Sequence, residues 1–590
     1  MTLFTRFTAH VDAALDALTA AGTLPAGMDR RNVTVEPPRD ATHGDLATNA
    51  AMVLAKPAGT NPRALAEALA GALRALPEVA EVTVAGPGFI NLRLHDDVWR
   101  AEIAAIRDGG DGYGRSTKGA GATVNIEYVS ANPTGPMHVG HCRGAVVGDA
   151  LANLLGKAGW DVTKEYYIND AGAQVQALAW AAYWRYLQAL GTTLTEDEFA
   201  AGVPGGLQYR GEYLIPVGEA LKARFGDSFA PGAAPADPVL WLDTVRSFTI
   251  DAMMAEIRDD LAALGVNFDI YISEAQLVRD GVADKAIAEL AAKGYVYEGV
   301  LEPPKGKTPD DWEPRPQTLF RSTQFGDDVD RPLRKSDGSN TYFANDIGNH
   351  ADKIARGFDE LVQVWGADHG GYVKRMQAAV KALSGNRPVP LDVVLAQIVK
   401  VMKNGEPVRM SKRAGTYVTL RDLIDEVGKD AVRFTMLTRK ADAQMEFDLD
   451  KVVEQSRDNP VFYVQYAHAR CRSVLRQAGD PAQAELAEAP MDSLSDPAEM
   501  ALIRRIMAWP RTVEAAAAAR EPHRIAFYLG DLAADFHLLW NRGRDDATLR
   551  FIREEDPAAT RARLALVAAT ALVIRSGLRV MGVTPVEEMR

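Results

Sequence analysis

The stretch Ala131-Asn-Pro-Thr-Gly-Pro-Met-His-Val-Gly-His141 decides the fold of this chain of 590 residues. A short apolar strand pattern at residues 124–129 precedes it, and a long helical pattern at about 140–158 follows it. A second strand pattern at residues 162–168 completes a strand–helix–strand unit. Because such units build parallel sheets, the sequence predicts an α/β domain around this stretch.

The chain divides into four predicted regions. The first combines two helical patterns with two alternating strands, as in a small α+β domain. The second continues the α/β pattern, with further strands at 361–365 and 389–398 and with loop-rich insertions. The third is a loop and a helical connection to the fourth, where strand patterns end and helical periodicity predicts an all-α bundle. The four regions are residues 1–110, 111–400, 401–459 and 460–590.

The composition, 47% hydrophobic and 25% charged, is that of a folded globular protein and excludes general disorder. The formal charge of −13 would by itself argue against a nucleic-acid partner, because phosphate binding normally needs a basic surplus. The charge is uneven, however, since residues 461–590 hold 17 arginines and 17 acidic residues and are therefore neutral. Net charge thus restricts where RNA could lie and does not decide whether it binds.

Two cysteines, Cys142 and Cys471, are too few for a disulfide framework or a cysteine-rich zinc site. We therefore expect no zinc and a reduced, cytoplasmic environment, with Cys142 as a buried packing residue. The first 22 residues carry Asp12 and Asp16 within an amphipathic helical pattern, so no signal peptide is expected. No run of 18 uncharged apolar residues occurs, so no membrane span is expected.

His138 and His141 lie three residues apart at the predicted helix start, so their imidazoles share one face of the helix. A helix N-terminus attracts anions, and two donors on one face suit a phosphate whose charge grows in a transition state. The same pair could equally be two ordinary histidines at a helix cap. A metal-binding pair is disfavoured, because no third ligand follows at a suitable spacing.

Residues 400–415, Lys-Val-Met-Lys-Asn-Gly-Glu-Pro-Val-Arg-Met-Ser-Lys-Arg-Ala-Gly, form a second chemical element. Five cations and one acid give it a local charge of +4, and Gly405 and Gly415 bracket it. These features suit a mobile loop that closes over a polyphosphate. Taken alone, such a run is more often an ordinary solvated loop.

Together these two elements resemble the HIGH and KMSKS sequences of the class I aminoacyl-tRNA synthetases. Arg409 and Arg413 replace the first Lys and the last Ser of the second motif, while its second Lys is kept as Lys412. The flanking sequences resemble those of arginyl-tRNA synthetases, and residues 44–48 and 86–91 resemble the extra N-terminal domain of that family. The flanking segments are residues 127–141, 167–172, 319–328, 337–342, 366–369 and 459–470.

The resemblance implies a multidomain enzyme with a Rossmann-type catalytic domain, which joins L-arginine to its tRNA through an arginyl-adenylate. His138 and His141 would stabilise the transition state at the α-phosphate of ATP, and Lys412 the leaving pyrophosphate, with Mg²⁺ sharing that charge. By position in the motifs, the implied ATP contacts are Ala131, Asn132, Pro133, Thr134, Gly135, Pro136, Met137, Val139, Gly140, Asp368, His369, Met410, Ser411 and Arg413.

An arginine substrate carries a planar guanidinium group, which a carboxylate binds best in a fork geometry. By resemblance, Tyr342 and Asp346, four residues apart on one helical face, would hold the guanidinium. Glu127 and Asn132, which lead to His138, would hold the α-ammonium and carboxylate ends. Asp368 and His369 follow a predicted strand end and are assigned to the ribose or adenine of ATP.

The helical region resembles the anticodon-binding domain of the family. Tyr463, Tyr466, His468 and Arg470 would stack on or hydrogen-bond to splayed anticodon bases. A competing interpretation places Tyr463 and Tyr466 on the packing face of the first helix. The partners implied are arginine tRNA, L-arginine and ATP, with no membrane, and the resemblance favours a monomer that activates arginine only with tRNA bound.

Three other functions were weighed against this one. A ligase for another amino acid, such as cysteine, would need a zinc site that two distant cysteines cannot supply. A tRNA-binding relative without catalysis would have no need of His138, His141 and Lys412. A free-standing adenylyltransferase would have no use for the helical C-terminal region.

Overall fold

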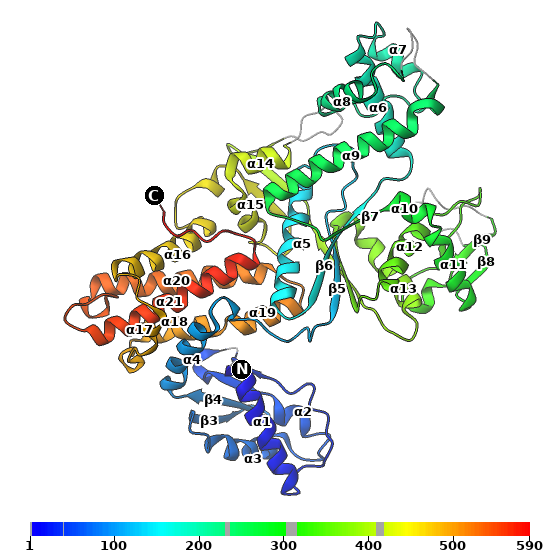
Figure 1. Cartoon of the computed structure of the whole chain (residues 1–590). Helices are drawn as coiled ribbons and strands as arrows, with labels where there is room; N and C mark the ends of the chain where they lie inside the picture. The colour runs from blue at the N-terminus through cyan, green and yellow to red at the C-terminus, as the bar shows by residue number, and fades with distance from the viewer. Residues whose placement is uncertain (1–2, 39, 230–236, 302–314, 409–417, 590) are drawn as a thin grey trace.

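The computed structural model describes residues 3–38, 40–229, 237–301, 315–408 and 418–589. The N-terminal unit is an antiparallel sheet of order β1-β2-β4-β3, flanked by helices (Figure 1). Its helical patterns and strand pair are confirmed as predicted. The elements are α1 (Leu3–Ala20), β1 (Val35–Glu36), β2 (Leu46–Thr48), α2 (Ala50–Leu54), α3 (Pro62–Arg74), β3 (Val79–Ala85), β4 (Phe89–Leu94) and α4 (Asp96–Gly109).

A five-stranded parallel sheet of order β12-β11-β5-β6-β7 forms the centre of the molecule. From β5, the chain first adds β6 and β7 on one side of that strand and later adds β11 and β12 on the other side. This is a doubly wound, Rossmann-type strand order. Ligands bind such sheets at the carboxyl ends of the strands where the order reverses, here between β5 and β11. The strands are β5 (Thr123–Glu127), β6 (Asp161–Ile168), β7 (Ile270–Ser273), β11 (Glu360–Gly366) and β12 (Leu391–Ala396).

Helix α5 (Val139–Lys157) directly follows β5 and the His138 motif, close to its predicted bounds. It packs against β5, β6 and β11 and also contacts helices α19 and α21 of the C-terminal region. A helix covered on several sides needs apolar residues around most of its circumference, and thirteen of its nineteen residues are buried. The helix that carries the histidines is therefore held from both the sheet and the bundle.

Two insertions interrupt the parallel sheet. The first, between β6 and β7, is a helical arm with its own aromatic core that projects from the sheet (Figure 1). The second, between β7 and β11, holds an antiparallel sheet of order β10-β9-β8. The elements are α6 (Ala173–Leu190), α7 (Glu196–Ala201), α8 (Ile215–Phe225) and α9 (Pro238–Leu264), then α10 (Glu274–Arg279), α11 (Val282–Ala292), β8 (Val296–Gly299), β9 (Gln317–Phe320), β10 (Arg331–Pro332) and α12 (Tyr342–Ala355).

The region after the sheet contains strands as well as helices. The sequence predicted a loop and a helical connection for residues 401–459, but β13 pairs in parallel with β15 and antiparallel with β14. In β13, Val399 and Val401 are buried while Lys400 is exposed, which is the alternation of a half-buried strand. The elements are β13 (Val399–Lys403), β14 (Glu406–Pro407), α14 (Leu420–Val427), α15 (Lys429–Met436) and β15 (Met445–Asp448), whereas α13 (Val373–Ser384) joins β11 to β12 within the sheet.

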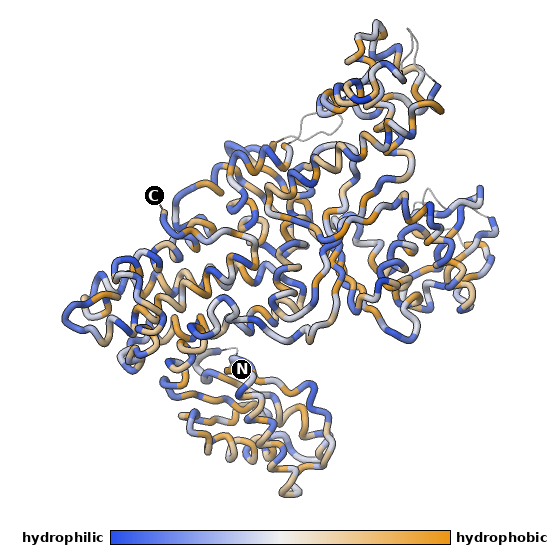
Figure 2. The backbone as a smooth tube through the Cα atoms, viewed as in Figure 1, coloured by the Kyte–Doolittle hydropathy of each residue, from blue (hydrophilic) through white to orange (hydrophobic). Residues whose placement is uncertain are grey.

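The C-terminal region is a bundle of helices, as predicted, in which polar and apolar residues alternate along the chain (Figure 2). Among the described helices, α21 alone is long and apolar enough to cross a membrane. Most of it is buried, however, against α16, α20 and α4, so it forms the core of the bundle. The helices are α16 (Pro460–Gln477), α17 (Gln483–Ala487), α18 (Pro497–Met507), α19 (Trp509–Ala518), α20 (His523–Asp545) and α21 (Pro557–Val580).

Candidate active site

The two histidines form the cap of α5. The Nδ1 atom of His138 accepts the Gly140 N–H at 3.0 Å, and Nδ1 of His141 accepts the His138 N–H at 3.3 Å. The rings stack with centroids 3.9 Å apart. A Cβ atom at position 140 would lie 2.7 Å from the His138 ring, so this cap requires glycine. Since both Nδ1 atoms serve the cap, Nε2 is the ring atom that would donate to a phosphate.

The segment after the second motif lies against the first. The Leu420 N–H donates to the Met137 carbonyl at 2.8 Å, and the Val139 N–H donates to the Val418 carbonyl at 3.3 Å. Residues 409–417, with Met410, Ser411, Lys412 and Arg413, lie outside the described residues. The chain therefore resumes after this segment in direct contact with the histidine motif, although almost 280 residues separate the two in the sequence.

A cavity of about 250 Å³ lies beside this motif, at the carboxyl ends of β5, β6 and β11. It has the position that a doubly wound sheet offers to a ligand. Three residues predicted for substrate binding, Glu127, Asp346 and His369, are among those that line it. The others are Val129, Ser130, Tyr167, Asn169, Asn349, His350, Gln363, Val364, Trp365, Gly366, Tyr372 and Met376.

Asp346 lies on α12, and its carboxylate lines this cavity. The Tyr372 hydroxyl donates to its Oδ2 atom at 2.5 Å. Burial raises the pKa of Asp346 to about 7, with further contributions from the charges of Glu274 and Glu127, although Tyr372 and Arg375 act in the opposite direction. Sequence reasoning missed Tyr372, whose only signal is its place just after the predicted ligand segment at 366–369.

Glu127 is buried and already held by several donors. Lys353 Nζ lies 2.8 Å from its Oε2, and the Gln363 Nε2 and Ser130 Oγ groups donate to its carboxylate, both at 3.1 Å. Burial alone would raise the pKa of Glu127, but Lys353, with smaller contributions from His350 and Gln363, outweighs that effect and lowers it. The fully buried Lys353 also pairs with Glu165, so it balances two carboxylates at once.

Lys353 and Gln363 were also missed by sequence reasoning. Lys353 lies seven residues after Asp346, hence on the same face of α12, where a lysine among buried residues is unusual. That position was a usable signal, whereas Gln363 inside the β11 pattern gave none.

The remaining predicted substrate contacts lie at or outside the rim of the cavity. Tyr342 begins α12 and is 80% exposed, with Lys335 Nζ 5.3 Å from its ring centre, so it does not face Asp346 across the cavity. The Asn132 side chain donates to Gln174 Oε1 at 2.7 Å. Asp368 and His369 are exposed in the short helix that follows β11 (Ala367–Tyr372).

In the bundle, α16 carries the four predicted RNA contacts in different environments. The Arg470 guanidinium donates to the Tyr466 hydroxyl at 2.7 Å and lies over the rings of Tyr466 and Trp540. His468 is fully buried and bonds the Val586 carbonyl through Nδ1 at 2.8 Å, while burial lowers its pKa. Its ring is thus enclosed in the bundle and cannot stack on a base in this structure. Tyr463 is half-buried against the bundle.

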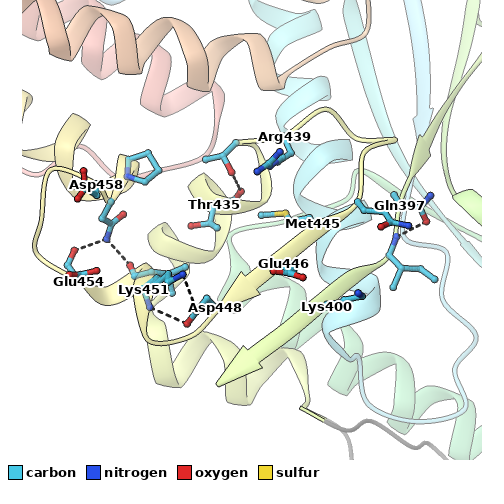
Figure 3. Close-up of a pocket in the computed structure, with 16 residues that line it drawn as sticks. Gln397, Lys400, Thr435, Arg439, Met445, Glu446, Asp448, Lys451, Glu454 and Asp458 are labelled. Carbon is cyan, nitrogen blue, oxygen red and sulfur yellow. Dashed lines mark hydrogen bonds and ion pairs between the residues drawn. The ribbon is translucent and has the colours of Figure 1, made fainter. Parts of the chain in front are cut away.

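A larger cavity, about 920 Å³, lies elsewhere, between β13, β15, α15 and the start of α16 (Figure 3). Lys400, Arg439 and Lys451 line it, but they are accompanied by four acids, Glu446, Asp448, Glu454 and Asp458. Lys451 lies 3.6 Å from Asp448. Because its cations are matched by acids, and because it contains none of the predicted site residues, this cavity is not a favoured polyphosphate site.

Both cysteines are buried, and burial raises the pKa of the Cys142 thiol to about 12. A thiol of this kind is a poor nucleophile, which agrees with the packing role predicted for it. Within the described ranges, no group of three or more His, Cys, Asp or Glu side chains is arranged to hold a metal ion.

Family models match three parts of the chain. Residues 5–94 match the arginyl tRNA synthetase N-terminal domain, residues 109–193 the catalytic domain of class I (R) tRNA synthetases, and residues 464–589 the DALR anticodon binding domain. The solved structure of Thermus thermophilus arginyl-tRNA synthetase, at 21% identity, covers both chains fully with a TM-score of 0.71 and supports the fold. A putative arginyl tRNA synthetase from Campylobacter jejuni has 29% identity and a TM-score of 0.70, covering 84% of this chain and all of that one.

Full-length relatives give the strongest comparison. The arginine–tRNA ligase of Gluconobacter oxydans is 62% identical over 96% of this chain and 95% of its own length. The arginine–tRNA ligase of Cereibacter sphaeroides (strain ATCC 17025) is 61% identical over the whole of both chains. With its doubly wound sheet, its histidine-capped helix and its helical C-terminal bundle, the chain belongs to the class I arginyl-tRNA synthetase family.

Proposed function

We propose that this chain ligates L-arginine to its cognate tRNA, with ATP as the second substrate and an arginyl-adenylate as the intermediate. The observation that carries the proposal is a cavity with two carboxylates, Asp346 and Glu127, lined by Val129 and Ser130 of the loop that leads from β5 to the helix capped by His138 and His141. A cationic amino acid and a nucleotide phosphate can meet there. The full-length similarity to arginine–tRNA ligases supports the same reaction.

In the first step, the arginine carboxylate attacks the α-phosphate of ATP, and pyrophosphate leaves. Asp346 binds the guanidinium in the cavity, since no lysine among the described residues contacts its carboxylate, whereas Lys353 pairs with Glu127. Nε2 of His138 and of His141 donate to the α-phosphate oxygens as their charge grows. The N-terminus of α5 adds its dipole to the same end of the site.

Glu127 contributes to the site mainly through its position and less through its charge. Its carboxylate is shared among Lys353, Gln363 and Ser130, so its interaction with the substrate α-ammonium is weaker than that of an unpaired acid. We assign the α-ammonium to the polar rim that Glu127 and Asn169 form. Lys412, outside the described residues, stabilises pyrophosphate together with Mg²⁺ bound to ATP, and Met410, Ser411 and Arg413 belong to the same nucleotide-binding segment.

In the second step, the arginyl group passes to the terminal ribose of the tRNA. We propose that α16 contributes Tyr466 and Arg470 to anticodon recognition, because both are partly exposed and the Arg470 guanidinium lies over the rings of Tyr466 and the half-buried Trp540. Stacking on aromatic and guanidinium planes is a common way to read splayed bases. The buried free cysteines agree with a reduced, cytoplasmic location, and the family resemblance favours a monomer.

The test is ATP/pyrophosphate exchange with purified protein, with and without tRNA. We expect exchange that depends on arginine and appears only when tRNA is present. Cysteine and glutamate in place of arginine serve as controls and should give no exchange. Exchange driven by either of them, without exchange driven by arginine, would overturn the proposal.

A further inference from the structure

The loop that precedes His138 is held by side chains that come from outside it. In the part of the chain that the structure describes, residues 130–134 pair with no neighbouring strand, and their buried carbonyl groups need other donors. The sheet supplies two donors: the Tyr166 hydroxyl bonds the Ala131 carbonyl at 2.8 Å, and the Asn169 amide bonds the Ser130 carbonyl at 2.9 Å. These two fix the first half of the loop.

The second half of the loop is held by the inserted helical arm. The Tyr213 hydroxyl donates to the Thr134 carbonyl at 2.7 Å, and Gln174 Oε1 accepts the Asn132 amide at 2.7 Å. The Tyr213 ring also covers Gly135, because a Cβ atom there would lie only 3.2 Å from the ring. Two different elements of the arm, α6 and the short helix Glu212–Leu214, thus contact consecutive parts of the loop.

The arm can fix the loop because it is itself well ordered around Tyr213. The Arg185 guanidinium, on α6, donates to the Arg210 carbonyl at 2.7 Å and to the Gly211 carbonyl at 3.4 Å. A Cβ atom on Gly211 would lie 2.2 Å from the Tyr213 ring, so the ring folds back over a glycine. Behind it lies the aromatic core of the arm, which includes the stacked pair Tyr183 and Trp241.

We propose that Tyr213 is a positioning residue for the nucleotide site, through which the inserted arm sets the geometry of the loop Asn132–Pro136. This inference rests on the proposed function, together with the assignment of that loop to ATP that the family resemblance implies. Misplacement of substrate-positioning groups by about 1 Å can reduce reaction rates about 10²-fold. The arm would then act on catalysis without any of its residues touching a reacting atom.

The test compares Tyr213→Phe with Tyr183→Phe in tRNA-dependent ATP/pyrophosphate exchange. The control is closely matched, because the Tyr183 hydroxyl also donates to a backbone carbonyl at 2.7 Å, that of Phe229, but inside the arm. A neutral hydrogen bond contributes about 0.5–1.5 kcal/mol, so Tyr213→Phe should lower kcat/KM for ATP about two- to tenfold. The KM for arginine should change less than twofold, and Tyr183→Phe should leave both values unchanged.

Two further variants extend the test. Gln174→Met removes the contact to Asn132 with little change in side-chain size. Like Tyr213→Phe, it should weaken the use of ATP, seen as a higher KM for ATP. Tyr213→Ala also removes the ring over Gly135, so its loss should exceed that of Tyr213→Phe. Unchanged ATP kinetics in Tyr213→Phe, equal effects of both Tyr→Phe changes, or a parallel loss for arginine and ATP would each overturn the inference. Failure of the proposed function would differ, because wild-type protein would then show no arginine-dependent exchange.

Discussion

Replacing Asp346 with Asn removes one of the two carboxylates of the arginine cavity, the one without a lysine partner among the described residues, and keeps nearly the same shape. The Tyr372 hydroxyl already bonds Oδ2, so we expect the substrate guanidinium to reach mainly Oδ1. A single charge-assisted hydrogen bond contributes about 1.5–3 kcal/mol, and 1.4 kcal/mol corresponds to about a tenfold change. The KM for arginine should therefore rise about 10- to 150-fold in tRNA-dependent exchange, while the KM for ATP stays within about twofold.

The pH dependence of arginine binding gives an independent measure of the same carboxylate. Its pKa of about 7 reflects burial, the acids Glu274 and Glu127, and the opposing effects of Tyr372 and Arg375. Only the ionised form attracts a guanidinium, so binding should strengthen as the pH rises from 6 to 8. With that pKa, the KM for arginine at pH 6 should be about ten times its value at pH 8. Asp346→Asn should abolish this dependence.

The stability of the protein without substrate should change in the opposite sense. Because the pKa of Asp346 is above the value of 3.8 for an ordinary Asp, its ionisation costs folding free energy as the pH rises from about 4 to 7. Asp346→Asn should therefore unfold at a higher temperature than wild type at pH 8, and the difference should narrow towards pH 5. A substrate-binding carboxylate that lowers the stability of the protein is an example of the common trade-off between function and stability.

The matched control for these measurements is Asp352→Asn, on the same helix but paired with Arg356 at 2.8 Å outside the cavity. It should leave the KM for arginine and its pH dependence unchanged. The reasoning is refuted if Asp346→Asn raises the KM values of arginine and ATP equally, or if the KM of wild type for arginine does not vary between pH 6 and 8.

Three further outcomes are expected. His138→Ala should lower the kcat of exchange about 10²- to 10³-fold, as loss of one transition-state donor does elsewhere, with a small change in the KM for arginine measured in parallel. Lys353→Met should leave Glu127 without a cationic partner and Glu165 with Arg356 alone, and should cost about 3–5 kcal/mol, seen as a lower thermal unfolding midpoint; an unchanged midpoint would contradict the pairing. Burial lowers the pKa of His537 to about 4, so the bundle should lose stability as the pH falls from 6.5 towards 4. At pH 5, the amides of α16 and α20 should therefore exchange faster relative to their intrinsic rates than at pH 7, and His537→Gln should reduce this difference.

The order of strands and the main helices could be predicted from the sequence because each has strong local periodicity. The pattern at 140–158 became α5, and the strand patterns at 162–168, 361–365 and 389–398 became β6, β11 and β12. The strands β13 and β15 could not be predicted in the same way. Both are short, and their pairing joins segments more than forty residues apart, which no local pattern reveals.

The site was only partly accessible from the sequence for a related reason. Glu127 and Asp346 belong to motifs, but the charge state of each depends on partners from distant segments. Lys353 sets the state of Glu127, and Tyr372 orients Asp346, although neither stood out in the sequence. Motifs thus identified which groups carry chemistry, whereas burial and pairing determine which of them is available to a substrate.

The charge of the inserted arm restricts what that arm can do. Residues 173–264 hold twelve acidic and six basic residues, so nearly half of the formal charge of −13 lies there. A surface of this sign repels a polyanion, so the arm is poorly suited to bind the tRNA backbone. The neutral, arginine-bearing bundle is better suited to that contact. The arm instead contacts the loop before His138 through uncharged groups, Gln174 and Tyr213, whose hydrogen bonds add no negative charge beside the phosphates. An acidic insertion can therefore support a phosphate site only through neutral donors and acceptors at its base, which is where Tyr213 lies.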